Sequence, residues 1–288
     1  MIDISKEPVI EQIPGRSFEF TVNWRSGTKD YKYVSSSNDI FSMYSEVLAG
    51  KLSTSSIKSS VLSGGSGVVM TFGEHKHGIS GRQTLWGCEA PNNMNPDFEI
   101  RSMTGEISFR KVGLTPGIMF DSRILLPWCL DIKRSKTEFD ICLIPSYKDI
   151  RFLEIKNKLE SNGMHVLNPN SHIRTHAHII SLSGVIITSS LSDFIIADAM
   201  GVPAYMFHTG DNYNEIHERL SDYYSAFSLN CPEILDFSSS ISTKSLPQNM
   251  YVSVSDVKDK LHQYLSVSPF PIRPDVESEI GGHLDALS

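Results

Sequence analysis

The chain has 288 residues, of which 40% are hydrophobic and 20% charged, and its formal net charge is -7 with a pI near 5.8. This composition is typical of a folded globular protein, and the length favours two compact lobes, with one large domain as the alternative. The acidic balance excludes broad, salt-driven binding to nucleic acid, which requires clustered Lys and Arg.

The sequence also argues against export, membrane insertion and metal-based chemistry. Residues 1–13 carry acids and no apolar run of signal-peptide length, which predicts a cytoplasmic protein. No segment reaches the roughly 20 apolar residues of a membrane helix. The cysteines lie far apart without a Cys-x-x-Cys pair, so we expect reduced thiols, no zinc site and no cofactor. They are Cys88, Cys129, Cys142 and Cys231.

The first half of the chain gives the weaker structural signals. Residues 18–24 alternate apolar and polar side chains and predict a strand, and residues 38–50 predict an amphipathic helix that ends at Gly50. Residues 51–66 are rich in Ser and Gly and predict a long loop. Apolar runs predict further strands at 67–72, 83–87 and 117–120, with a short helix near 104–112.

The second half alternates apolar runs and amphipathic stretches with hardly a residue between them. Strands are predicted at 139–145, 164–167, 185–189 and 204–207, and helices at 149–161, 171–183, 190–200, 213–227 and 255–266. Gly163, Gly184 and Gly201 follow helical stretches, as C-cap glycines do. This βα alternation requires right-handed crossovers and a mostly parallel sheet covered by helices on both faces.

We therefore predict an α/β protein with mostly parallel sheets, divided into three parts. Residues 1–132 form an N-terminal α/β lobe and residues 133–266 a C-terminal Rossmann-like lobe, with the basic segment 131–137 as the linker. Residues 267–288 contain three prolines and are predicted to be an extended, weakly ordered tail.

Hydroxyl side chains gather where the predicted strand at 185–189 meets the next helix. In a parallel sheet, ligands bind beyond the carboxyl ends of the strands, where helix N-termini present free N–H groups. Ser189, Ser190 and Ser192 therefore predict a cradle for a carboxylate or phosphate. The alternative is a capping box, in which Ser190 and Asp193 bond each other's backbone N–H, and the acid competes with any anion for the helix dipole.

Residues 186–203 read Ile-Ile-Thr-Ser-Ser-Leu-Ser-Asp-Phe-Ile-Ile-Ala-Asp-Ala-Met-Gly-Val-Pro. This segment resembles the signature of the polysaccharide pyruvyltransferase family, roughly I-S-S-S-L-H-G-L-I-x-A-D-A-Y-G-I-P. Weaker matches to family segments occur in family order at Leu85–Cys88, Ile100–Gly105, Phe120–Pro127, Leu143–Asp149 and Arg219–Ser225. The resemblance thus spans about residues 83–226.

The resemblance implies two Rossmann-like lobes arranged as in GT-B glycosyltransferases, with the site in the cleft between them. It implies transfer of the enolpyruvyl unit of phosphoenolpyruvate to two hydroxyls of a surface-polysaccharide sugar, forming a cyclic ketal and releasing phosphate. The implied partners are phosphoenolpyruvate and a sugar acceptor. A lipid-linked acceptor would make the protein peripheral to a membrane.

The same resemblance suggests the donor-binding residues. Arg101 is the candidate anion clamp, because guanidinium binds carboxylate and phosphate in a bidentate manner. Ser146, Ser189, Ser190, Ser192 and Asp193 complete the predicted donor-binding set.

The catalytic residues are harder to predict, because the chain departs from the family pattern. Ser192 and Ser146 stand where the family has histidines, and serine cannot replace a histidine as general acid near neutral pH. His172, Asp121 and Ser192 are the remaining catalytic candidates. His172 and His176 share a helix face, but without a third ligand they do not predict a metal site. Histidines in the segment 74–77 are further candidates, with a polar loop as the alternative.

Three functions follow from these observations. The first is a pyruvyltransferase of surface-polysaccharide assembly. The second is a catalytically silent relative that acts as a binding subunit, which the two missing histidines favour. The third is a glycosyltransferase with a nucleotide-sugar donor on the same architecture, since a fold does not fix chemistry.

Overall fold

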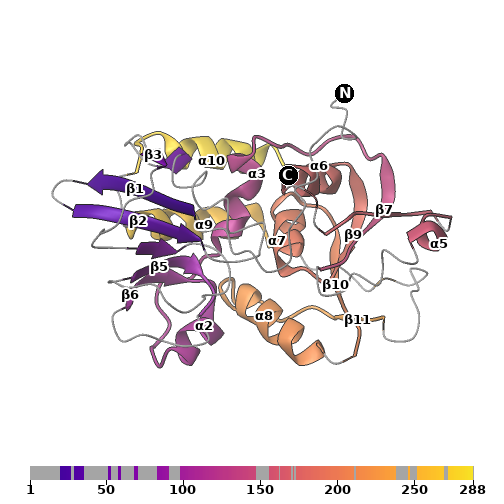
Figure 1. Cartoon of the computed structure of the whole chain (residues 1–288), viewed down its shortest axis with the longest axis horizontal. Helices are drawn as coiled ribbons and strands as arrows, with labels where there is room; N and C mark the ends of the chain where they lie inside the picture. The colour runs from indigo at the N-terminus through magenta and orange to yellow at the C-terminus, as the bar shows by residue number, and fades with distance from the viewer. Residues whose placement is uncertain are drawn as a thin grey trace.

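The computed structural model describes residues 20–26, 29–35, 51–52, 58–59, 68–70, 83–90, 98–146, 156–161, 163–169, 171, 173–210, 212–237, 246, 252–268 and 272–287. These residues form an α/β structure with two mostly parallel sheets. Figure 1 shows the sheets at opposite sides of the molecule, with helices between and around them. The predicted helix at 38–50 lies outside the described residues.

The first sheet has six strands in the order β3-β1-β2-β4-β5-β6. They are β1 (Phe20–Ser26), β2 (Lys29–Ser35), β3 (Lys58–Ser59), β4 (Val68–Met70), β5 (Gln83–Cys88) and β6 (Phe98–Met103). The strands from β2 through β4 and β5 to β6 are parallel, whereas β1 pairs antiparallel with β2 and β3. The predicted strand at 117–120 is reduced to a single bridge between Met119 and Met103.

The second sheet has five strands in the order β11-β10-β9-β7-β8, and every neighbouring pair is parallel. They are β7 (Phe139–Ile144), β8 (Met164–Val166), β9 (Ser183–Thr188), β10 (Ala204–His208) and β11 (Leu235–Asp236). The helices that follow β7, β8, β9 and β10 are α5 (Lys156–Ser161), α6 (Ile173–Ser181), α7 (Leu191–Ala199) and α8 (Tyr213–Ser225). This confirms the predicted parallel sheet with crossover helices.

Two of the three predicted C-cap glycines have the required left-handed backbone. Gly163 and Gly201 have φ values of +80° and +64°, which only glycine adopts without a steric penalty. The prediction for Gly184 is wrong, because this residue lies within β9. A Cβ atom there would lie 2.8 Å from the carbonyl oxygen of Asp140, so glycine serves close packing of β9 against its neighbour.

The connection between the sheets is helical. It contains α2 (Glu106–Lys111), a 3-10 turn η3 (Ser122–Leu125) and α3 (Leu126–Cys129), and α2 confirms the short helix predicted near 104–112. No helix in the described part of the chain is long and apolar enough to cross a bilayer.

The prediction of an extended C-terminal tail is wrong. Residues Val276–Asp285 form α10, which follows α9 (Val254–Ser266). Val276, Ile280 and Leu284 recur every four residues and are buried, so one face of α10 is apolar and packed. The prolines precede this helix and do not interrupt it.

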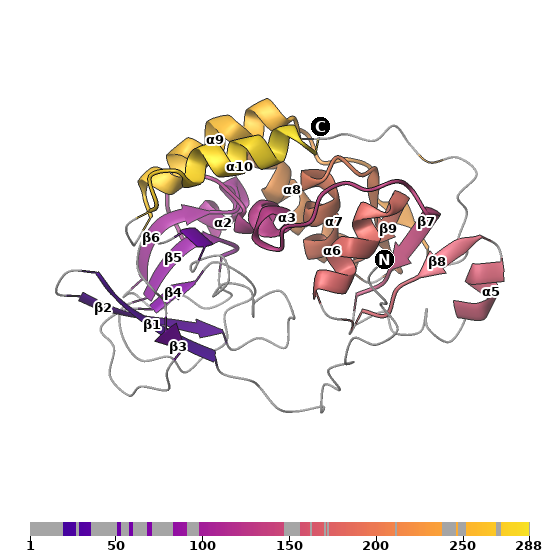
Figure 2. The ribbon, with the colours of Figure 1, turned by 90° about the horizontal axis from the view of Figure 1, so that it is seen from above.

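The two C-terminal helices pack against elements of the first half of the chain. The Trp86 ring of β5 stacks on Tyr264 of α9 with ring centroids 4.2 Å apart, and its N–H donates to the Tyr264 carbonyl at 3.1 Å. The indole of Trp128 in α3 donates to Glu279 of α10 at 3.1 Å. Figure 2 shows α9 and α10 side by side over β5 and β6. The predicted boundaries placed the segment 255–266 in the C-terminal lobe. In the structure this segment also packs against the first half of the chain.

A continuous core crosses the predicted boundary at residue 132. The largest cluster of buried apolar side chains includes Trp86 and Phe120 from the first half, Ile186 and Phe194 from the second, and Tyr264 from α9. This continuity holds the carboxyl edge of the second sheet against η3, where the candidate site lies.

Candidate anion-binding site

The strand order of the second sheet reverses between β7 and β9, and the residues after these strands meet. The backbone N–H of Ser146 donates to Ser189 Oγ at 2.9 Å. Thr188 Oγ1 donates to the carbonyl oxygen of Ile144 at 2.7 Å and accepts from the N–H of Ser190 at 2.9 Å. Such a reversal is the topological switch point at which doubly wound sheets bind ligands. The structure thus brings Ser146, Ser189 and Ser190 together as predicted, and all three are half-buried.

The start of α7 is capped, but only half of the predicted capping box forms. Ser190 Oγ accepts from the N–H of Asp193 at 3.4 Å. Asp193 does not reach back to the cap; its Oδ1 lies 2.7 Å from Nδ1 of His176 on α6, and both side chains are buried. The position of Asp193 therefore does not support the prediction that it contacts the donor, because its carboxylate faces His176 on α6 and is buried.

Ser192 belongs to a different set of contacts. It is 5% exposed, and its Oγ accepts from Nη1 of Arg123 at 3.2 Å. Arg123 lies on η3, so this contact joins the two halves of the chain at the switch point. The sequence analysis did not select Arg123, although this residue lies within the segment 120–127 that resembles the family. Its position two residues after Asp121 is the sequence feature that could have indicated an ion pair.

Asp121 holds Arg123 in place. Its carboxylate accepts from Nε of Arg123 at 2.9 Å and from Nη2 at 2.6 Å, which is the bidentate geometry of a strong ion pair. It also accepts from the backbone N–H of Arg123 at 2.9 Å and from Thr104 Oγ1 at 3.0 Å. The Asp121 carboxylate is buried, and all four of these hydrogen bonds come from protein groups. These contacts are those of a residue that positions Arg123, and they do not support the predicted catalytic role of Asp121.

Two arginines and two acids form a neutral cluster beside the corner. Glu89 bridges Nη2 of Arg123 at 2.8 Å and Nε of Arg219 at 2.9 Å. Burial raises the pKa of Glu89, but the positive charges and hydrogen bonds of Arg219 and Arg123 outweigh burial and lower that pKa to about 2. Glu89 therefore stays ionised at neutral pH beside the two arginines.

Other predicted site residues lie elsewhere. Arg101 is exposed on β6 and forms an ion pair with Glu99, and it contacts none of the corner residues in the described part of the chain. The prediction of Arg101 as an anion clamp is therefore not supported by its position. His172 and the segment 74–77 lie outside the described residues.

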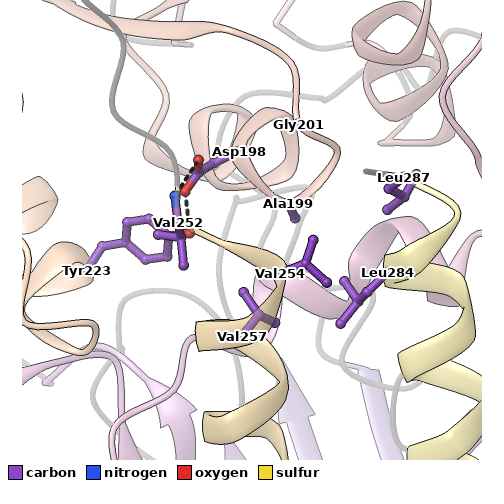
Figure 3. A pocket seen from close by; sticks show the side chains of 9 residues that line it. All are labelled: Asp198, Ala199, Gly201, Tyr223, Val252, Val254, Val257, Leu284 and Leu287. Atoms are coloured by element: carbon purple, nitrogen blue, oxygen red, sulfur yellow. Dashed lines mark hydrogen bonds between the residues drawn. The ribbon is translucent and has the colours of Figure 1, made fainter.

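Several residues of the segments that resemble the family connect helices. Asp198 of α7 accepts from the Tyr223 hydroxyl at 2.7 Å and from the N–H of Val252 at 3.3 Å (Figure 3). Asp222 accepts from Ser108 through both its N–H and its hydroxyl. Burial raises the pKa of Asp198 to about 7 and that of Asp222 to about 6. These aspartates have structural roles.

A pocket of about 220 Å³ lies beside Asp198, at the C-terminal end of α7 and so at the opposite end of this helix from Ser190 (Figure 3). Its lining is mostly aliphatic and comprises Asp198, Ala199, Gly201, Tyr223, Val252, Val254, Val257, Leu284 and Leu287. The pocket is therefore separate from the hydroxyl corner.

Comparisons with known proteins identify no relative. No protein-family model, no curated protein and no solved structure matches the chain. The resemblance of residues 186–203 to the pyruvyltransferase signature therefore stays a prediction.

Proposed function

We propose that this protein is a cytoplasmic pyruvyltransferase that binds phosphoenolpyruvate at the switch-point corner and transfers its pyruvyl unit to a sugar as a ketal. The proposal includes two Rossmann-like lobes of GT-B type with the site between them. One observation carries it: the hydroxyl residues Ser189 and Ser190 lie where the strand order reverses between β7 and β9, and Ser189 contacts Ser146 there.

The corner offers suitable groups for a small acid. Ser146, Ser189 and Ser190 are half-buried hydroxyl residues beside the N-terminus of α7, where the helix dipole favours negative charge. Arg123 adds a guanidinium whose Nε and Nη2 bind Asp121 and Glu89, whereas Nη1 contacts only Ser192 among the described residues. The Arg123 side chain is buried, so it supports the corner through its contact with Ser192 Oγ.

Donor binding tests this proposal without knowledge of the acceptor. Isothermal calorimetry with phosphoenolpyruvate is expected to detect binding. Ser189→Ala and Ser190→Ala are each expected to weaken it by about tenfold or more, since hydrogen bonds to charged groups contribute about 1.5–3 kcal/mol. Ser255→Ala is a matched control, because this serine is exposed in the first turn of α9. Phosphate release with a panel of lipid-linked and nucleotide-linked sugars tests transfer. Absence of any heat with phosphoenolpyruvate would contradict the proposal.

A catalytically silent binding subunit is the second candidate. The cluster around Arg123 favours it, because Glu89 and Asp121 form ion pairs with both arginines and offset the positive charge that a doubly charged phosphate would need. The serines at 146 and 192 in place of family histidines favour it too. This candidate predicts that phosphoenolpyruvate binds weakly or not at all and that no tested sugar causes phosphate release.

A further inference from the structure

The pocket beside Asp198 has the size and lining of a site for a small, partly apolar ligand. Its volume of about 220 Å³ exceeds the roughly 150 Å³ of an aliphatic cavity that binds benzene, so a hydrocarbon group of about six carbon atoms fits. Valine and leucine side chains in and around α9 and α10 form most of its wall (Figure 3). Gly201 is exposed and Ala199 and Val254 are half-buried, so the pocket opens to solvent on their side.

Asp198 is the acidic residue in the lining of this pocket. Its side chain is buried, and each of its two carboxyl oxygens accepts one hydrogen bond, from the Tyr223 hydroxyl and from the N–H of Val252. A carboxylate has about four acceptor positions, so these two bonds leave capacity for a further donor. In the described part of the chain, no Lys, Arg or His is among its hydrogen-bond or charge partners.

The charge of Asp198 therefore has no compensation from the described side chains. A carboxylate that is removed from water without a positive partner is costly, and either a proton or a cation relieves this cost. Burial raises the pKa of Asp198 to about 7, so the carboxyl is about half ionised at neutral pH. A ligand with a positive charge and an apolar body matches both the carboxylate and the aliphatic wall.

We propose that this pocket binds a small alkylammonium ion, whose alkyl group lies against the aliphatic wall and whose nitrogen donates to the Asp198 carboxylate. A primary ammonium has three N–H donors and no acceptor, which suits a carboxylate with free acceptor positions. Asp198 keeps its hydrogen bonds to Tyr223 and Val252 in the complex. The proposal is independent of the pyruvyltransferase function, because the pocket lies at the opposite end of α7 from Ser190.

Isopentylammonium and its neutral counterpart isopentanol test the proposal, because their alkyl groups are identical and only the charge differs. NMR titrations that follow the methyl groups of Val254 and Leu284 measure binding. At pH 8, isopentylammonium is expected to bind about tenfold more tightly than isopentanol, since charge-assisted hydrogen bonds are about twice as strong as neutral ones. Its affinity is expected to rise about tenfold from pH 6 to pH 8, because the Asp198 carboxyl, with its pKa of about 7, ionises over this range while the ammonium keeps its charge.

Two variants separate the contribution of charge from that of shape. Asp198→Asn removes the negative charge and is expected to weaken isopentylammonium binding by about tenfold and to abolish its pH dependence, with isopentanol binding changed by less than about twofold. Ala199→Met places a larger side chain in the pocket and is expected to abolish binding of both ligands. Asp259→Asn and Ala286→Met are the matched controls, because both residues are exposed and lie outside the pocket lining. Melting temperatures check that each variant is folded.

Three results would overturn the proposal. The first is the absence of methyl shifts with isopentylammonium up to about 10 mM, a concentration suited to ligands of this size. The second is equal affinity for both ligands at both pH values, which would leave Asp198 with its structural contacts alone. The third is tighter binding of isovalerate, with an affinity that falls as pH rises, which would assign the pocket to a carboxylic acid. Phosphoenolpyruvate binding is measured separately and is expected to be unchanged in Ala199→Met, so failure here leaves the proposed function standing.

Discussion

Arg123 Nη1 donates to Ser192 Oγ across 3.2 Å, and these two residues come from opposite halves of the chain. The contact fixes the start of α7 relative to η3, since Arg123 is itself held by Asp121 and Glu89. The geometry of the hydroxyl corner therefore depends on a buried ion-pair network whose members are not adjacent to it in sequence.

Removal of Arg123 is expected to destabilise the protein. Arg123→Met leaves two buried carboxylates without their shared partner, which costs about 3–5 kcal/mol in the free energy of unfolding. Urea unfolding monitored by circular dichroism measures this. Arg101→Met is the matched control, because Arg101 is exposed and its change is expected to stay within about 0.5 kcal/mol. Equal unfolding midpoints for the two variants would contradict the buried network.

Asp198 is expected to make the protein less stable as pH rises from about 4 to about 7. Burial raises its pKa from 3.8 to about 7, so between these values the folded state binds more protons than the unfolded state. The free energy of unfolding then falls with rising pH and levels off above about 7. Asp222, whose pKa is raised to about 6, contributes in the same direction.

Asp198→Asn isolates this effect. The amide still accepts from the N–H of Val252 and offers an N–H to the Tyr223 oxygen, but it does not titrate. Thermal melts from pH 5 to pH 8 should therefore show a shallower fall in melting temperature for Asp198→Asn than for the wild-type protein. An unchanged slope would show that Asp198 is ionised throughout this range in the folded state.

Tyr264 tests whether the C-terminal helices stabilise the first sheet. Its ring is buried against Trp86 and lies 4.6 Å from the ring of Phe120. Tyr264→Ala is expected to lower the free energy of unfolding by about 3–5 kcal/mol, because loss of a buried aromatic ring leaves a cavity. It should also shift Trp86 fluorescence to longer wavelength. Tyr213→Ala, at an exposed ring, is the control for stability, and equal losses for both would contradict this packing.

Local patterns in the sequence determined the second sheet and the position of the corner. Apolar runs of strand length alternate with amphipathic stretches over residues 139–208, and each is a signal carried by neighbouring residues. Gly163 and Gly201 mark chain reversals for the same local reason. Because crossovers are right-handed and strands are parallel, the hydroxyls after β9 had to lie at the carboxyl edge.

Only the tertiary structure decided which partners the polar side chains take. His176 lies 17 residues before Asp193, and Arg123 lies 69 residues before Ser192; no sequence period encodes such contacts. The same limit explains the tail, where prolines suggested an extended chain although the apolar face of α10 is buried against distant elements. Periodicity specifies which face of an element is apolar, but the surface that covers this face, and the charges that meet there, are set by the packing of segments far apart in the chain.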